Sequence, residues 1–440
     1  MASDPRTLID ERPMSGLQIA AVAIAVGLNA LDGFDVLSIS FASPGIAAEW
    51  GIDRAALGVV LSMELIGMAA GSLLLGGVAD SIGRRRTILG CLVVMVFGMV
   101  MATQAHGVVD LSVWRVTTGL GIGGMLAATN AITAEFANLR RRNLALAIMV
   151  IGYPIGAVIG GSISALLLKG GDWRTVFAFG AIATAAFIPL VWFFVPEPVQ
   201  FLVARRPKGA LEAINRTLAR MGHEVVDSLP EVTAAESRQS IADIFSPALL
   251  ATTILATFAY FAHIVSFYFI LKWSPKIVVD MGFAPSSAAG VLVWANIGGA
   301  VGGAIFGLLA HRFGLKPLTI AALLASTVMV SVFGSAGHST LAHLSTLACA
   351  AGLFTNGAVV GIYTILARAF PTHVRATGTG FAIGIGRGGS ALSPMLAGVL
   401  FQSGFGLQGV AIAMAMGSLL AAGALLMLRL RVDAPVMAGN

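Results

Sequence analysis

Charged residues are scarce in this chain of 440 residues, because Asp, Glu, Lys and Arg together make up only 11% of it. A soluble globular domain has about 25%. Apolar residues make up 57% of the sequence, and the mean hydropathy is +0.89. This composition excludes an ordinary soluble domain and predicts an all-α polytopic membrane protein whose main surroundings are the lipid bilayer.

Sequence signals for several other classes of protein are also missing. No Gly-Lys-Ser or Gly-Lys-Thr occurs, so the phosphate-binding loop of a primary pump is excluded. The seven histidines are scattered, and the two cysteines, Cys91 and Cys349, fall inside apolar runs, which argues against a metalloenzyme and a disulfide framework. The net charge of +6 is spread between apolar segments and does not indicate nucleic-acid binding. We therefore expect neither enzymatic activity nor a cofactor.

Twelve apolar runs are long enough to cross a bilayer as helices, since about 20 residues span its hydrocarbon layer. They lie at about 17–41, 55–78, 87–105, 110–135, 143–168, 174–195, 247–271, 286–309, 317–336, 341–367, 374–400 and 406–429. The predicted domains are an N-terminal tail (1–16), a six-helix bundle (17–196), a partly helical central loop (197–246), a second six-helix bundle (247–430) and a C-terminal tail (431–440).

The distribution of basic residues predicts the topology. If the N-terminus is cytoplasmic, the cytoplasmic segments hold twenty of the 27 Lys and Arg residues, whereas five lie in the opposite loops, among them Lys272. Cytoplasmic loops carry such an excess of positive charge. Both tails and the central loop are therefore expected in the cytoplasm.

The two halves of the chain contain related loops. Residues 76–86 (GGVADSIGRRR) follow the second predicted span, and residues 307–316 (GLLAHRFGLK) follow the eighth. This pattern predicts two parallel six-helix repeats with a substrate site between them near the midplane. A channel is a physical alternative, but charges at the midplane fit alternating access better.

Three acids fall inside predicted spans and away from their terminal residues, and an ionised side chain there costs about 2.5–3.5 kcal/mol. Asp32 and Asp35 lie near the end of the first span in the stretch LDGFD, three residues apart and so on one helix face. Glu64 lies midway along the second span. We expect the aspartates to carry protons, with Glu64 as a lesser candidate; the alternative is that the aspartates lie in water at the outer mouth.

Two arginines also lie inside predicted spans. Arg115 is at the same level as the aspartates and is expected to pair with Asp32, either as a proton-coupling switch or as a static ion pair. Arg387 lies near the midplane in GIGRGGS, where the glycines are expected to leave room for a ligand. Because arginine binds carboxylates through two parallel hydrogen bonds, an organic acid is the expected ligand; a salt bridge to another helix is the alternative.

Aromatic and amide side chains inside the spans are candidates for the rest of the substrate site, although aromatic residues in spans more often serve in packing. The candidates are Phe34, Tyr153, Tyr260, Phe267, Trp294, Tyr363, Asn130, Asn296 and Asn356. The amides can instead cross-link helices. His263 is expected to be structural.

The related loops contain the candidate gating residues. In the first half these are Asp80, Arg84 and Arg85, with Glu135 at the end of the fourth span as a partner for an arginine. Their counterparts in the second half are His311, Arg312 and Arg375. We expect these ion pairs to form in one conformation and break in the other. The alternatives are a local pair of Glu135 with the arginines at 140–142 and a purely topological role for the arginines.

These motifs resemble those of the major facilitator superfamily, and more narrowly those of its aromatic acid:proton symporters. The loop motif of the superfamily is matched by Gly76, Asp80, Gly83, Arg84 and Arg85, although Ser81 replaces a usual arginine. The narrower resemblance rests on LDGFD and the glycine-flanked Arg387, with further matches in RVTTGLGIGG (115–124) and FPTHVRATGTG (370–380).

The resemblance implies proton-coupled uptake of small aromatic carboxylates, such as hydroxybenzoates, by a monomer in the bacterial inner membrane. It also implies a coupling role for Arg115 and a gating role for an acid at Glu135. The alternatives are a proton-coupled exporter of amphipathic compounds, which Arg387 would hinder if the cargo were cationic, and an importer of non-aromatic organic acids.

Overall fold

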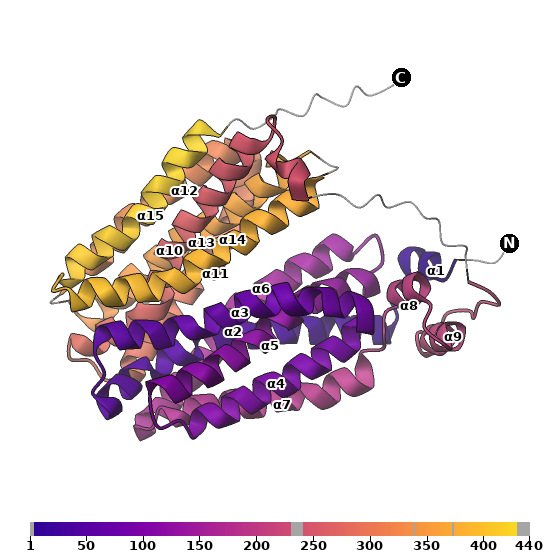
Figure 1. Cartoon of the computed structure of the whole chain (residues 1–440), viewed down its shortest axis with the longest axis horizontal. Coiled ribbons are helices and arrows are strands. Elements are labelled where there is room, and N and C mark those ends of the chain that lie inside the picture. Colours follow the sequence, from indigo (N-terminus) through magenta and orange to yellow (C-terminus); the bar gives the residue numbers. More distant parts are fainter. Residues whose placement is uncertain (1–3, 230–240, 338, 372–373, 429–440) are drawn as a thin grey trace.

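The computed structural model describes residues 4–229, 241–337, 339–371 and 374–428. Within these ranges, twelve helices of at least 20 residues form two bundles (Figure 1). The N-terminal bundle contains α2 (Gly16–Trp50), α3 (Arg54–Ile82), α4 (Arg84–Thr103), α5 (Val108–Phe136), α6 (Arg142–Leu167) and α7 (Arg174–Phe194). The C-terminal bundle contains α10 (Leu250–Asp280), α11 (Pro285–Phe313), α12 (Leu315–Gly334), α13 (Leu341–Ala369), α14 (Arg375–Gln402) and α15 (Leu407–Met427).

These helices correspond one to one with the twelve predicted spans, so the predicted fold class is confirmed. Within the described residues, ten of them are long and apolar enough to cross a membrane by length and composition. The other two are α5 and α14, which carry Arg115 and Arg387.

The first span is longer than the sequence indicates. α2 has 35 residues and continues past Pro44 to Trp50, where Gly51 ends it in the left-handed conformation. Its start is fixed by a capping box between Ser15 and Gln18. The LDGFD stretch is therefore in the middle of a helix, not near its end as predicted, because the residues beyond it stay helical for four more turns.

Short helices lie together at one end of the N-terminal bundle (Figure 1). They are α1 (Pro5–Glu11) in the predicted N-terminal tail, and α8 (Val199–Arg205) and α9 (Ala210–Arg220) in the predicted central loop. An ion pair of 2.5 Å between Arg142 and Asp10 attaches α1 to the start of α6. We call this end of the protein the basal end and the opposite end the distal end. Residues 431–440, the predicted C-terminal tail, lie outside the described residues.

Glycines bring equivalent helices of the two bundles into close contact. In the N-terminal bundle, a Cβ atom added to Gly67 or Gly71 of α3 would lie 2.2 Å from a backbone oxygen of α5. In the C-terminal bundle, a Cβ atom added to Gly298 or Gly302 of α11 would lie 1.9 or 2.1 Å from a backbone oxygen of α13. Small residues allow such contacts between membrane helices. The same pairing in both halves agrees with the predicted repeat.

The two related loops have the same backbone turn. Gly83 between α3 and α4 has a φ of 110°, and Gly314 between α11 and α12 has a φ of 79°. Residues with a side chain rarely adopt such positive values, so glycine permits the tight turn in each half.

The bundles contact each other in the distal half of the protein. Near the distal end, Arg54 of α3 donates a hydrogen bond of 3.0 Å to Asp280 of α10, and a Cβ atom added to Gly58 would lie 2.5 Å from the Pro394 oxygen of α14. Toward the basal end the bundles diverge (Figure 1). The candidate site is built where they meet.

Candidate functional site

The two aspartates of LDGFD are deeply buried, with 2% of Asp32 and 0% of Asp35 exposed. Among the described residues, neither Asp32 Oδ1 nor Asp35 Oδ1 has a hydrogen-bond partner. Thr184 of α7 donates a weak hydrogen bond of 3.5 Å to Asp35 Oδ2. The aspartates therefore do not lie in water at the mouth of the helix, and their burial without full compensation is unusual for carboxyl groups.

The residues between the aspartates pack α2 against its neighbours. A Cβ atom added to Gly33 would lie 2.0 Å from the carbonyl oxygen of Tyr153 in α6. Phe34, which was predicted to contact substrate, is 3% exposed and packs its ring 5.1 Å from that of Phe179 in α7. The motif thus combines two carboxyl groups with tight helix packing, and Phe34 lies inside the N-terminal bundle.

We expect Gly33→Ala to destabilise the protein. The added methyl group would overlap the Tyr153 carbonyl oxygen and force α2 away from α6, and overpacking of this kind costs about 1–3 kcal/mol. The apparent Tm of detergent-purified protein should fall. The control is Gly90→Ala in α4, where an added Cβ has no atom within 4 Å. Equal melting temperatures for the two variants would contradict the packing role.

Arg115 pairs with Glu64, not with Asp32 as predicted. Both side chains are fully buried, and Arg115 Nη2 forms an ion pair with Glu64 Oε1. The same nitrogen donates a hydrogen bond of 3.1 Å to the backbone oxygen of Asp35. The pairing follows from helix packing, because Gly119 lets α5 approach the backbone of Glu64 closely. The guanidinium thus reaches α2 at the Asp35 backbone.

Lys272 joins this pair from the other bundle. It was assigned to an outer loop, but α10 continues to Asp280 and the lysine side chain is fully buried. Its Nζ lies 3.6 Å from Glu64 Oε2 and donates a hydrogen bond to the Val36 carbonyl oxygen of α2. Lys272 was not predicted as a site residue. The apolar residues Ile277, Val278 and Val279 beyond it are the signal that the span continues.

The buried charges are divided unevenly between the bundles. The acids are all in the N-terminal bundle, whereas the cations lie on both sides. Within the described residues, the fully or almost fully buried charged side chains are Asp32, Asp35, Glu64, Arg115 and Lys272. The half-buried Arg387 adds a second cation from the C-terminal bundle. The N-terminal bundle thus holds three acids and one arginine, and the C-terminal bundle supplies two cations to the same region.

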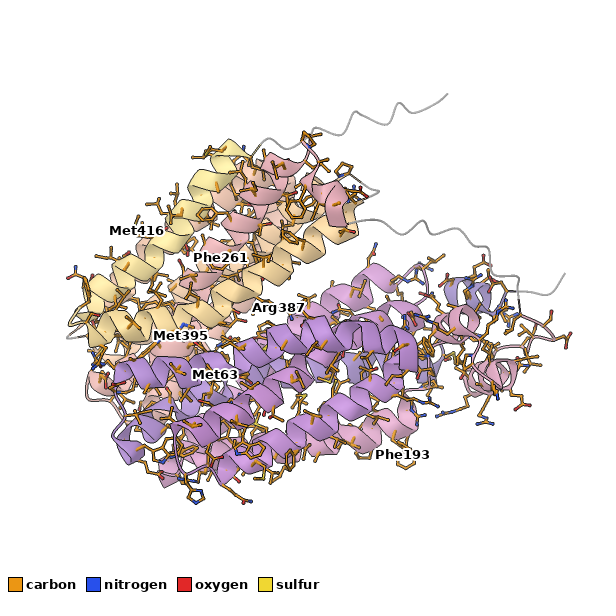
Figure 2. All side chains as sticks on the ribbon, in the orientation of Figure 1. Met63, Phe193, Phe261, Arg387, Met395 and Met416 are labelled. Carbon is orange, nitrogen blue, oxygen red and sulfur yellow. The ribbon has the colours of Figure 1, made fainter. Side chains whose placement is uncertain are left out.

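Arg387 lies between the bundles (Figure 2) and reaches across to α3, where its guanidinium donates a hydrogen bond to Ser72. Asp32 is close enough for an electrostatic interaction with it. Among the described residues, however, no carboxylate lies within salt-bridge distance of Arg387. The alternative of a structural salt bridge therefore finds no partner in the described part of the chain.

The glycines around Arg387 serve mainly in helix packing. A Cβ atom added to Gly386 would lie 1.9 Å from the ring of Tyr260, and one added to Gly389 would lie 2.6 Å from the backbone of Phe261. Both neighbours belong to α10. An added Cβ at Gly384 would meet nothing within 4 Å. The expectation that the glycines leave room for a ligand is therefore wrong for Gly386 and Gly389, because α10 occupies that space.

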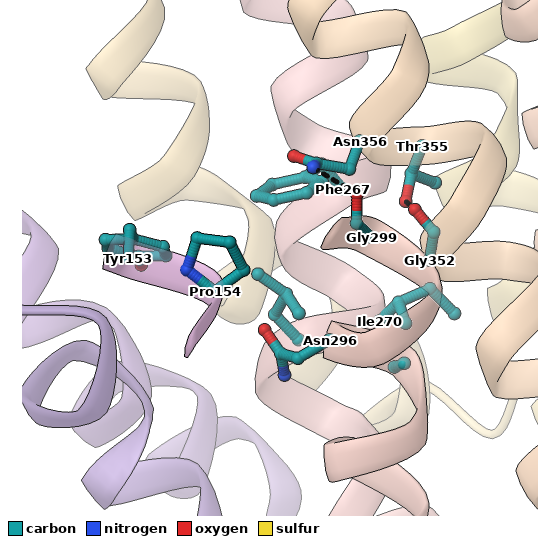
Figure 3. Close-up of a pocket in the computed structure, with 11 residues that line it drawn as sticks. Tyr153, Pro154, Phe267, Ile270, Asn296, Gly299, Gly352, Thr355 and Asn356 are labelled. Atoms are coloured by element: carbon teal, nitrogen blue, oxygen red, sulfur yellow. Dashed lines mark hydrogen bonds between the residues drawn. The ribbon is translucent and has the colours of Figure 1, made fainter. Parts of the chain in front are cut away.

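A pocket lies between α6 of one bundle and α10, α11 and α13 of the other (Figure 3). It contains about 380 Å³ of empty space, part of it open to solvent. Its lining is largely apolar and includes four predicted residues: Tyr153, Phe267, Asn296 and Asn356. Ligand sites combine apolar walls with a few polar groups in this way. Arg387 and the buried acids do not line this pocket.

The chain has four tyrosines, of which Tyr153 lines this pocket. The Tyr260 and Tyr363 hydroxyls are 2.8 Å apart and hydrogen-bonded. The ring of Tyr268 packs 5.3 Å from that of Phe267, which lines the pocket. Tyr268 was not among the predicted site residues, although its spacing from Tyr260, two helical turns along α10, was an available signal.

Three further candidates lie apart from this arrangement. Trp294 is 49% exposed and does not line the pocket. Asn130 is exposed and donates to Leu126 of its own helix. His263 is fully buried, with one ring nitrogen 2.9 Å from Ser418 and the other 2.9 Å from the Thr355 oxygen, which is a structural arrangement. Asn356 lines the pocket and also cross-links helices, since it donates a hydrogen bond of 2.6 Å to Gly299.

The structure brings Arg84 and Glu135 together at the basal end, 3.4 Å apart. It also places Glu197, which the sequence analysis did not single out, against the start of α4, where its carboxylate accepts the backbone N–H of Arg84 at 2.5 Å. Burial raises the pKa of Glu197 above its ordinary value, although this hydrogen bond opposes the shift. Gly83 leaves the space that the Glu197 carboxylate occupies.

The other predicted gating residues make local contacts or are not described. Arg85 donates a hydrogen bond of 2.6 Å to the Trp192 oxygen. Arg312 stacks 5.6 Å from the ring of Phe313, and Arg375 lies 3.5 Å from the Phe370 oxygen. The side chains of Asp80 and His311 lie outside the described part of the structure.

Two six-helix bundles with a pocket between them are the architecture of a membrane transporter. The chain belongs to the Major Facilitator Superfamily, whose family model matches residues 25–305 and 273–440. It is therefore a multi-pass membrane transporter and not an enzyme.

Relatives of known name are transporters of aromatic acids. The chain is 32% identical to the 4-hydroxybenzoate transporter PcaK of Pseudomonas putida, over 95% of this chain and 94% of that protein. It is 29% identical to the gallate transporter of the same organism, over 92% and 90%. It is also 29% identical to the 3-(3-hydroxy-phenyl)propionate transporter of Escherichia coli, over 89% of each chain.

Solved structures show the same fold. The crystal structure of a D-xylose-proton symporter matches with a TM-score of 0.73 and 17% identity, covering 93% of this chain and 97% of that chain. The inward-open xylose transporter XylE from E. coli matches with a TM-score of 0.74 and 16% identity, covering 96% and 98%.

Proposed function

We propose that the protein imports small aromatic carboxylates together with protons. The observation that carries this proposal is the division of charge between the bundles. If the bundles move apart in the transport cycle, the acids at Asp32, Asp35 and Glu64 keep only Arg115 as a counter-ion, whereas Lys272 and Arg387 leave with the other bundle. The excess of carboxyl groups in the N-terminal bundle can then be neutralised by bound protons. The excess of positive charge in the C-terminal bundle can be neutralised by the carboxylate of the substrate.

The substrate ring is proposed to occupy the pocket beside Tyr153 and Phe267, with its carboxylate directed to Arg387. Asn296, Asn356 and the tyrosine hydroxyls supply hydrogen bonds for ring substituents. The named relatives support this choice, because they transport 4-hydroxybenzoate, gallate and 3-(3-hydroxyphenyl)propionate. Hydroxylated aromatic acids are therefore the first substrates to test.

We place the protein in the bacterial inner membrane with its basal end in the cytoplasm. The arginines at 84–86 and 140–142 begin α4 and α6 at that end, as the positive-inside rule requires. We propose that the ion pair of Arg84 and Glu135 opens and closes during the cycle and that a single chain is the functional unit.

The test is uptake of labelled 4-hydroxybenzoate into proteoliposomes with an inside-alkaline pH gradient. A weak acid also accumulates passively in alkaline vesicles, so protein-free liposomes measured in parallel give the background. We expect protein-dependent accumulation that a protonophore abolishes and excess benzoate blocks. A dicarboxylic acid and a sugar serve as competitors. If no aromatic acid is taken up or competes, the proposed substrate class is wrong, and aliphatic acids and amphipathic compounds become the next substrates.

A further inference from the structure

Lys272 is a buried lysine of one bundle whose contacts lie in the other bundle. It belongs to α10 of the C-terminal bundle, but it contacts Glu64 and the Val36 carbonyl oxygen, which belong to the N-terminal bundle. Val36 follows Asp35 directly, and the Asp35 carbonyl oxygen accepts a hydrogen bond from Arg115. The ammonium group therefore lies beside Glu64, which is one of three buried acids in the opposite bundle. We call these three acids, Asp32, Asp35 and Glu64, the acid cluster.

This contact cannot survive separation of the bundles. A buried ammonium group is stable only with partners, and both partners stay behind on the N-terminal bundle. Arg115 is different, because it belongs to the same bundle as Glu64 and keeps its ion pair. Arg115 therefore contacts Glu64 in every conformation, whereas Lys272 contacts it only when the bundles are together.

The positive charge of Lys272 changes how tightly the acid cluster binds protons. A nearby cation favours the ionised form of a carboxyl group, and neighbouring carboxylates favour the protonated form. With Lys272 in place, the acid cluster has two contacting cations; without it, three acids share Arg115. Protons are then bound more tightly in the separated state and less tightly in the closed state.

We propose that Lys272 competes with a proton for the acid cluster, so that closure of the distal half of the protein drives proton release. This inference rests on the proposed function and names the residue that links bundle movement to the proton. Lys272 is a positioning and coupling residue, and it does not need to touch the substrate.

Other ionisable groups near this contact also affect proton binding by the acid cluster. They are left unchanged in the variants tested. They come from helices of both bundles. They are Asp32 and Asp35 on α2, Glu64 on α3, Arg115 on α5, Tyr153 on α6, Tyr268 on α10 and Arg387 on α14.

The experiment compares Lys272→Met with wild type in proteoliposomes, using labelled 4-hydroxybenzoate. Counterflow without a pH gradient is measured across a pH series, and accumulation is measured with the gradient. Without the competing ammonium, the protonated carrier persists to higher pH, so the midpoint of the counterflow profile should rise by about one pH unit. Gradient-driven accumulation should fall about fivefold. Lys272→Arg, which keeps the charge, should resemble wild type.

The matched control is Lys276→Met, one turn further along α10, where the lysine pairs with Asp280 of its own helix. It should leave both measurements unchanged. Lys272→Gln is the second neutral variant in case Lys272→Met does not reach the membrane. An unmoved midpoint with full accumulation in a neutral Lys272 variant would overturn the role of Lys272 and leave symport intact. Absence of gradient-driven accumulation by the wild type, with counterflow present, would instead refute the proton coupling on which this inference rests.

Discussion

The Asp32→Asn variant is expected to lose proton-driven accumulation of aromatic acids while keeping counterflow. Asparagine has nearly the same shape as aspartate but cannot release a proton, so the carrier is held in a neutral form that exchanges substrate without moving protons. A gradient of about one pH unit supports about tenfold accumulation for one coupled proton. That ratio should fall to the passive level of protein-free liposomes, measured with labelled 4-hydroxybenzoate.

The control for this variant is Asp53→Asn. Asp53 caps the N-terminus of α3 by accepting the backbone N–H of Ala56 at 2.7 Å, and asparagine caps helices equally well. This variant should accumulate substrate like the wild type. Full gradient-driven accumulation by Asp32→Asn would remove Asp32 from proton coupling and direct attention to Asp35 and Glu64.

The Arg387→Lys variant is expected to bind aromatic carboxylates about 10- to 100-fold more weakly. Arginine can hold a carboxylate through two parallel hydrogen bonds, whereas lysine offers a point charge on a shorter stem. Loss of one hydrogen bond to a charged group costs about 1.5–3 kcal/mol. The measurement is the concentration dependence of counterflow for benzoate, 4-hydroxybenzoate and gallate.

Arg174→Lys provides the matched control. Arg174 forms two hydrogen bonds of 2.7 and 2.8 Å with Glu49 at the distal end of the N-terminal bundle, away from the pocket. Its replacement tests whether loss of any bidentate arginine alters transport. Unchanged affinity of Arg387→Lys for all three acids would show that the carboxylate binds elsewhere.

The fold was predictable because its signals are local. Each span is an apolar run of sufficient length, and each turn between spans has its own markers, such as Gly83 and Gly314. Helix length was harder to predict. α2 extends beyond Phe41 to Trp50 through Pro44, because a proline inside a long packed helix does not end it.

The pairing of charges was not predictable to the same degree. Asp32 was the expected partner of Arg115 because both lie at the same depth, but depth does not specify which faces of two helices meet. Gly119 brings α5 against Glu64, and that contact selects the acid. The glycines beside Arg387 were misinterpreted for the same reason, because the sequence does not show that Tyr260 occupies the space at Gly386.

The sequence by itself determined that this protein is a membrane transporter built from two six-helix repeats, with acids and arginines inside its spans. Apolar length, charge content and repeated motifs encode these properties along the chain. Only the tertiary structure decided that Glu64 joins Arg115, that Lys272 contacts the opposite bundle, and that Tyr260 pairs with Tyr363. The physical reason is that these contacts depend on the rotation and close approach of helices far apart in sequence, which many weak packing interactions set together.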